Sequence, residues 1–86
     1  MRVIVPGQLY DYTAGVSRLD ADGDSLGAVL DNLDRRYPGL RFRVVDEQGR
    51  IRRHIRMYLN RAPAMSLAQP VAVDDELLIV GALSGG

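Results

Sequence analysis

The 86-residue chain contains no cysteine and no lysine, and it has a single histidine. Without cysteine there is no disulfide, no thiolate metal site and no cysteine nucleophile. His54 alone cannot form a zinc site of the usual kind, and a Ser-His-Asp triad would have to be built around it, so we interpret it as a residue at a strand edge. No apolar run approaches the roughly 18 residues of a membrane-spanning helix. No group of acid, base and nucleophile stands out either, so we expect no catalytic residues and no metal site.

The length and composition predict one small globular domain. A chain of this size buries roughly 60–68% of the surface that it exposes when unfolded, which suffices for one modest core. The hydrophobic fraction of 47% and the charged fraction of 26% are ordinary for such a domain. The segment before Pro6 is too short for a signal peptide, so we expect a cytoplasmic protein.

Charge is balanced overall but unevenly distributed. All eleven basic residues are arginines, and residues 35–56 hold eight of them against two acidic residues, a net charge of +6. Such a segment can bind nucleic acid, but it can also be a solvated face or a patch that docks on an acidic protein. Because the segment has few aromatic residues for base stacking, we favour the second interpretation and expect no nucleic acid as a partner.

Four segments are rich in the β-branched and apolar residues typical of strands, and residues 54–60 also alternate between apolar and polar side chains. They are residues 1–5, 16–21, 54–60 and 76–80. The segments between them are predicted to be irregular: residues 8–15 a loop, residues 40–45 extended or irregular chain, and residues 65–73 a loop with room for one short strand.

One segment is predicted to be a helix. Ser25, or Asp24 beside it, can accept the free N–H groups of the first turn, and Pro38-Gly39 ends the helix. Gly27 is expected to allow close packing against the sheet. A single apolar stripe runs along the helix. It consists of Leu26, Val29, Leu30, Leu33 and Tyr37.

The order of elements predicts an α+β roll, with a mixed sheet of four to five strands packed on one main helix. The first and last strands can lie side by side and parallel at the sheet centre, because the intervening helix supplies the crossover. Alternation then directs one set of side chains to the helix. This set is Met1, Val3, Val5, Ile55, Met57, Leu59, Leu77 and Ile79.

The last residues differ in character from the rest. Nothing in residues 82–86 can pack a core, so we predict a domain over residues 1–81 and a flexible tail over residues 82–86. Gly85 and Gly86 carry no Cβ and fit a narrow channel. A terminal carboxylate is ionised at neutral pH, and five extended residues span about 16–18 Å. Such a tail is suited to insertion into another protein's active site, although a frayed end remains the alternative.

Several short segments, in this order and spacing, resemble the ThiS/MoaD sulfur-carrier family of the β-grasp, ubiquitin-like fold. They are Asp24-Ser25-Leu26-Gly27-Ala28-Val29-Leu30, Tyr37-Pro38-Gly39, Asp46-Glu47-Gln48-Gly49-Arg50, Met57-Tyr58-Leu59-Asn60, Val73-Asp74-Asp75-Glu76 and Gly85-Gly86. The long middle segment is most similar to carriers of the CysO type or to long MoaD-type subunits. The tail before the glycines and the Asp74-Asp75-Glu76 turn depart from the usual family pattern, so the acceptor stays open.

The resemblance implies how the chain works. An adenylating enzyme of the ThiF/MoeB type uses ATP and magnesium to join AMP to the Gly86 carboxylate, with Gly85 beside it. A sulfur donor replaces AMP and leaves a thiocarboxylate, which delivers sulfur to a synthase in cysteine biosynthesis or molybdopterin synthesis. The carrier itself is expected to bind no cofactor.

The face of the sheet away from the helix is expected to show Ile4, Tyr58, Leu78 and Val80. These are too apolar for a face that meets only water, so we predict that they bind the partner enzymes, with Leu83 as an anchor on the tail. Strand propensity or a homodimer contact would also explain them. Two other functions stay open: a ubiquitin-like modifier conjugated through Gly86, and an arginine-rich module that binds RNA or protein.

Overall fold

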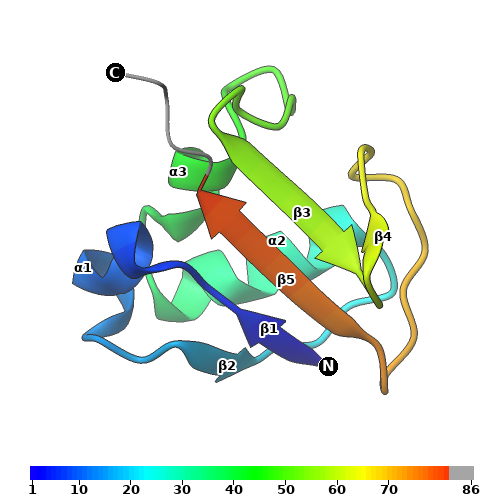
Figure 1. Cartoon of the computed structure of the whole chain (residues 1–86), viewed down its shortest axis with the longest axis horizontal. Helices are drawn as coiled ribbons and strands as arrows, with labels where there is room; N and C mark the ends of the chain where they lie inside the picture. Colours follow the sequence, from blue (N-terminus) through cyan, green and yellow to red (C-terminus); the bar gives the residue numbers. More distant parts are fainter. Residues whose placement is uncertain (82–86) are drawn as a thin grey trace.

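The computed structural model describes residues 1–81, which form a five-stranded mixed sheet with its helices on one face (Figure 1). The order of strands across the sheet is β2-β1-β5-β3-β4. The strands are β1 (Arg2–Ile4), β2 (Arg18–Asp20), β3 (Ile55–Leu59), β4 (Ala62–Pro63) and β5 (Glu76–Gly81). The helices are the 3-10 helix η1 (Gly7–Leu9), α1 (Tyr10–Thr13), α2 (Leu26–Arg36) and α3 (Leu40–Val44). The predicted α+β roll is confirmed.

Strand β5 lies at the centre of the sheet. It runs parallel to β1, with Val3 opposite Leu77, and antiparallel to β3, with Met57 opposite Ile79. Strand β2 adds to the far side of β1 as an antiparallel neighbour. The predicted parallel pairing of the first and last strands is therefore confirmed, and α2 provides the main crossover between them (Figure 1).

The core lies between α2 and one face of the sheet. The predicted inward-facing strand residues are all buried except Met1, which is partly buried against the core. The stripe of α2 that meets them is completely buried at Leu26, Val29, Leu30 and Leu33. Burying a leucine or valine side chain contributes about 1.5–3 kcal/mol each, so this contact supplies most of the stability of so small a domain.

Helix α2 begins and ends as predicted. The Ser25 backbone is extended, and its Oγ accepts a hydrogen bond from the Ala28 N–H at 3.2 Å. After Tyr37 the chain turns through Gly39, whose φ of 95° favours glycine. Gly27 differs from the prediction, because it approaches a loop instead of the sheet: its N–H donates to the Leu67 carbonyl at 2.9 Å.

Two segments predicted as irregular contain helical turns. Residues 8–15 include the end of η1 and all of α1, whose inner side buries Leu9 and Thr13. Residues 40–45 include α3, which buries Leu40 and Val44. In both cases the buried residues are four apart, which is the spacing of one helical turn.

Residues 65–73 contain only an isolated bridge between Pro70 and Ser25 in place of the short strand that they had room for, and the short strand β4 lies earlier in the chain. A tight turn at Asn60 and Arg61, both with positive φ, joins β3 to β4. Asn60 also fixes the start of β5, since its Nδ2 donates to Asp75 Oδ1 at 2.8 Å and its Oδ1 accepts from the Glu76 N–H at 3.0 Å. Over residues 1–81, no helix has both the length and the apolar character required to cross a bilayer.

Candidate partner-docking site

The site starts where β5 ends. Gly81, the last described residue, pairs with Ile55 at the beginning of β3. The tail residues predicted to act, Leu83, Gly85 and Gly86, lie outside the described residues. The domain therefore presents the base of the tail at one end of its central strand.

The side chain of Gln8, from η1, lies against Gly81. A Cβ placed on Gly81 would overlap the Gln8 side-chain amide, so the two residues are in close contact. Gln8 thus covers one side of the tail base, and β3 flanks it on the sheet side. No local pattern in the sequence predicts this contact, because it depends on how η1 folds back toward the sheet.

The outward face of the sheet carries an apolar row across three strands. Ile4 on β1, Leu78 on β5 and Tyr58 on β3 are direct neighbours in the register. Leu78, the central one, is 37% exposed, while Ile4 and Tyr58 are half-buried. Val80, also half-buried, lies further along β5 and immediately precedes Gly81. We call these four residues the open-face patch.

The predicted placement of these residues on one face is thus observed, while their role in binding stays a prediction. A shallow hollow of about 320 Å³ interrupts the patch, lined by Tyr58 and Leu78 together with Arg61 and Glu76. Apolar side chains beside charged groups are the composition expected for a protein-binding surface. The patch leads along β5 to the tail base, so a partner that covers it would also receive the tail.

Within residues 1–81, two carboxyl groups have shifted pKa values, and both belong to turns. The Arg50 N–H, as the largest cause, lowers the pKa of Asp46 in the 46–49 turn. The Asn60 side chain does the same for the pKa of Asp75 before β5. Both pKa shifts arise from hydrogen bonds within turns, so neither marks a catalytic carboxyl group in a cleft. Within residues 1–81, no three acidic or histidine side chains are grouped so that they could hold a metal ion.

Comparison with known proteins agrees with this geometry. The profile of the ThiS family matches residues 3–86. The chain belongs to the ThiS family. It is 33% identical to the sulfur carrier protein CysO of Mycobacterium tuberculosis, over 98% of this chain and 96% of that protein.

Solved structures show the same fold. A chain of the BexX/CysO complex from Amycolatopsis orientalis superposes with a TM-score of 0.90 at 28% identity, covering 99% of this chain and 98% of that one. Small archaeal modifier protein 1 from Haloferax volcanii superposes with a TM-score of 0.77 at 32% identity, covering 100% and 98%. The β-grasp, ubiquitin-like assignment is therefore confirmed.

Proposed function

We propose that this protein is a sulfur carrier that is loaded at the carboxylate of Gly86. In the first step, a carboxylate oxygen attacks the α-phosphorus of ATP on a ThiF/MoeB-type enzyme and pyrophosphate leaves. In the second, hydrosulfide (HS⁻) attacks the acyl carbon, the bond from that carbon to the AMP oxygen breaks and AMP leaves, and loss of the sulfur-bound proton gives the thiocarboxylate. ATP and magnesium belong to the activating enzyme, and the carrier acts as its protein substrate in the cytoplasm.

The observation that carries this proposal is the continuity of the open-face patch with the tail base on one strand. Residues 82–86 extend from Gly81 and span at most about 16–18 Å, so a partner seated on the patch can hold its reactive centre within reach of Gly86. Gly85 and Gly86 allow a narrow channel around the chain end. Membership of the ThiS family and the sulfur carriers among its relatives support the same role.

The sulfur would then pass to a synthase that accepts it. The relatives named CysO favour an acceptor in cysteine biosynthesis, with molybdopterin synthesis as the alternative. The same patch would serve this second partner, because the activating enzyme must dissociate before the thiocarboxylate can enter the synthase.

Intact-mass spectrometry tests the loading directly. After incubation with ATP, magnesium, the cognate adenylating enzyme and a sulfide source, the chain should gain the mass difference between sulfur and oxygen. A variant that lacks Gly85 and Gly86 should gain nothing. If the full chain is never adenylated by any ThiF/MoeB-type enzyme of its own organism, the proposal is wrong.

The patch is tested by replacing Tyr58 and Leu78 with aspartate. The double variant should stay folded and lose adenylation, because two carboxylates would have to be buried in the complex. Val73→Asp is the control for an added carboxylate at an exposed apolar position, since Val73 is 81% exposed and lies outside the patch. Unchanged adenylation of the double variant would refute the docking role.

A second function, conjugation to other proteins through Gly86, is favoured by one relative. Small archaeal modifier protein 1 of Haloferax volcanii is 37% identical over 80% of this chain and 79% of that protein. Peptide mapping of proteolysed cell extracts would test this function, because a conjugate would leave a C-terminal peptide of this chain joined through Gly86 to a lysine of the target protein. The chain has no lysine, so it cannot itself be the acceptor in a lysine-linked polymer.

A further inference from the structure

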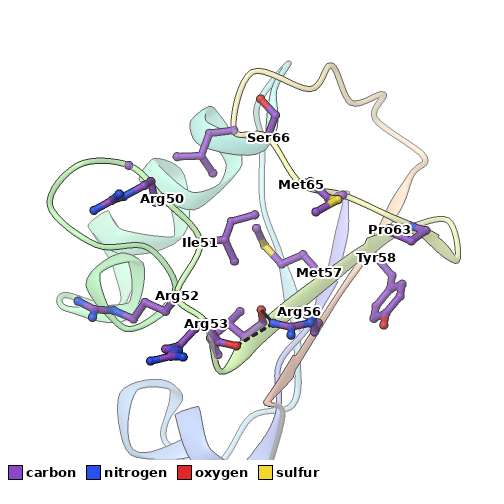
Figure 2. A pocket seen from close by; sticks show the side chains of 14 residues that line it. Arg50, Ile51, Arg52, Arg53, Arg56, Met57, Tyr58, Pro63, Met65 and Ser66 are labelled. Atoms are coloured by element: carbon purple, nitrogen blue, oxygen red, sulfur yellow. Dashed lines mark hydrogen bonds between the residues drawn. The ribbon is translucent and has the colours of Figure 1, made fainter.

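A groove of about 770 Å³ lies beside β3, between the loop at residues 49–53 and the segment at residues 63–67 (Figure 2). Its floor is aliphatic and includes Ile51 and Met57, with Met65 at its upper side. Four arginines line it: Arg50, Arg52, Arg53 and Arg56. We call this feature the arginine groove.

The four guanidinium groups are not equally available. Arg50 pairs with Asp46 at 3.4 Å, and Arg52 donates to the Phe42 carbonyl at 2.7 Å while its guanidinium stacks on the Phe42 ring. These two arginines stabilise their own loop. Among the described residues, neither of the other two, Arg53 and Arg56, forms an ion pair.

Arg56 is held in place without being neutralised. Its Nη1 donates to the backbone carbonyls of Arg53 at 2.8 Å and Ile55 at 3.0 Å, which leaves its other nitrogens for a ligand (Figure 2). A guanidinium whose position is already fixed loses less conformational entropy on binding a carboxylate. Arg53 is exposed beside it, at the end of the groove where β3 begins (Figure 2).

This charged end of the groove adjoins the tail base. In the register of β3 and β5, Arg56 lies opposite Val80, and Ile55 lies opposite Gly81. Tyr58 lines both the groove and the hollow in the open-face patch, so the two surfaces are continuous. A partner that covers the patch and receives the tail must therefore also meet Arg53 and Arg56.

The groove fits an extended protein segment. Strand β4 pairs only with Tyr58 and Leu59, so the first part of β3 borders the groove. The outer backbone groups there are already bonded, because the Ile55 N–H donates to the Arg52 carbonyl at 2.9 Å and the Met57 carbonyl accepts from the Ala64 N–H at 2.8 Å. A segment in the groove would therefore be bound by side chains. The floor is aliphatic and thioether in character, with Tyr58 as its one aromatic side chain, whereas single-stranded RNA is bound on several aromatic platforms. An acidic segment with apolar side chains complements both the floor and the charge.

We propose that the arginine groove binds an acidic segment at the entrance of the partner enzyme's channel, through carboxylates that pair with Arg53 and Arg56. This rests on the proposed carrier function. Because the tail spans at most about 16–18 Å between Gly81 and Gly86, the arginines meet the entrance of the channel while the chain end meets the nucleotide. The groove thus contributes to recognition and not to the chemical step.

The first experiment compares two charge-reversed double variants of the full chain. Arg53→Glu with Arg56→Glu alters the groove, while Arg35→Glu with Arg36→Glu makes the same charge change on exposed arginines of α2, outside the groove and on the helix side of the sheet. The groove variant should weaken binding to the cognate adenylating enzyme by about tenfold to thirtyfold at low salt and flatten its salt dependence. The control should stay within about twofold, and at saturating enzyme both variants should still be adenylated at the wild-type rate.

The second experiment uses the absence of lysine. Arg53→Lys and Arg56→Lys each introduce one side-chain amine while keeping the charge, and a zero-length carbodiimide joins such an amine only to a carboxylate in contact with it. Peptide mapping of the complex should find either lysine linked to an acidic residue of the partner. Arg35→Lys, on α2 and away from the open-face patch, should give no such link when treated identically.

The outcomes separate the groove from the carrier function. If the wild-type chain is not adenylated at all, the carrier function is wrong. If it is adenylated but the groove variant binds like the control, or no cross-link forms at either lysine, the groove proposal alone is wrong. Binding of a single-stranded RNA that is lost in the groove variant, with enzyme affinity unchanged, would instead make the groove a nucleic-acid site and overturn the proposal.

Discussion

Leu77 and Leu78 are neighbours on β5 that face opposite sides of the sheet, and their truncation should therefore have different consequences. Leu77 is completely buried against α2, whereas Leu78 is 37% exposed at the centre of the open-face patch. Leu77→Ala loses the transfer free energy of the side chain and leaves a cavity, which costs about 3 kcal/mol of unfolding free energy. For a domain of this size, that lowers the melting temperature by roughly 12–24 °C.

Leu78→Ala should cost about 1 kcal/mol in the isolated domain, because the space it vacates opens to water and leaves no cavity. For partner binding the order of the two variants should be reversed, because Leu78 lies on the open-face patch and Leu77 does not. A partner that buries the remaining 37% of Leu78 gains roughly 0.6–1.1 kcal/mol from it, at about 1.5–3 kcal/mol for a whole leucine side chain. Truncation should then weaken partner binding by about threefold to sixfold.

Urea titrations followed by circular dichroism, with calorimetric binding to the adenylating enzyme, measure both quantities. The binding measurement on Leu77→Ala must be made at a temperature where that variant is fully folded. Equal losses of stability in the two variants would refute the assignment of the two faces. A Leu78→Ala variant that binds the enzyme with unchanged affinity would refute the patch.

Three further predictions concern residues at the start of α2 and in the turn before β5. Ser25→Ala removes the cap of α2 and should cost about 1 kcal/mol in urea titrations. Gly23→Ala should cost about 1–3 kcal/mol in the same assay, because a Cβ there would lie 2.7 Å from a backbone nitrogen of α2. Asn60 chiefly lowers the pKa of Asp75 below 3.8 in the folded protein, so this group's contribution to stability is present at neutral pH and is lost as the pH falls through the lowered pKa. Asp75→Asn should therefore flatten the acid side of the stability profile between about pH 5 and pH 2.

Each of these three predictions has a control variant or an outcome that would contradict it. Ser25→Asp should retain most of the cap, so an equal loss in both Ser25 variants would show that the hydrogen bond is not the cause. A methyl group added at Gly15 would meet only open space, so the alanine variant at that position should suffer only backbone strain. An acid profile of Asp75→Asn that coincides with the wild type would contradict the role of the Asn60 contact.

The main elements could be predicted from the sequence because their signals are local. Strand β3 alternates between apolar and polar side chains, β5 is an apolar run of strand length, and α2 has a cap, an apolar stripe and a Pro-Gly end. Successive side chains of a strand point to opposite faces, which was enough to place the four residues of the open-face patch on one face of the sheet. These elements also supply most of the core.

The sequence of α3, by contrast, is misleading. Residues 40–44 alternate between apolar and arginine side chains, which is typical of a strand, yet Phe42 is 52% exposed while Leu40 and Val44 are buried. The reason is tertiary: Asp34, on α2, accepts hydrogen bonds from the Gly39 and Arg41 N–H groups and so starts a helical turn there. No pattern within residues 40–44 could have indicated the contact with Asp34.

The arginine groove could not be predicted from the sequence for a similar reason. The net charge of residues 35–56 was visible in the sequence, but not which arginines stabilise their own loop and which stay available to a ligand. Arg52 is committed to its own loop, while Arg56 stands beside the end of β5. Only the register of β3 against β5 brings that part of the charged segment to the base of the tail.

The central position of β5 also determines how the domain withstands force. A pull on the segment beyond Gly81 acts along the axis of β5, and β1 and β3 hold that strand on both sides through hydrogen bonds that lie across the direction of pulling. Such an arrangement loads all the bonds together in shear and does not open them one by one. If the chain is repeatedly drawn by its end into partner enzymes, as we propose, the domain would therefore remain folded through each cycle.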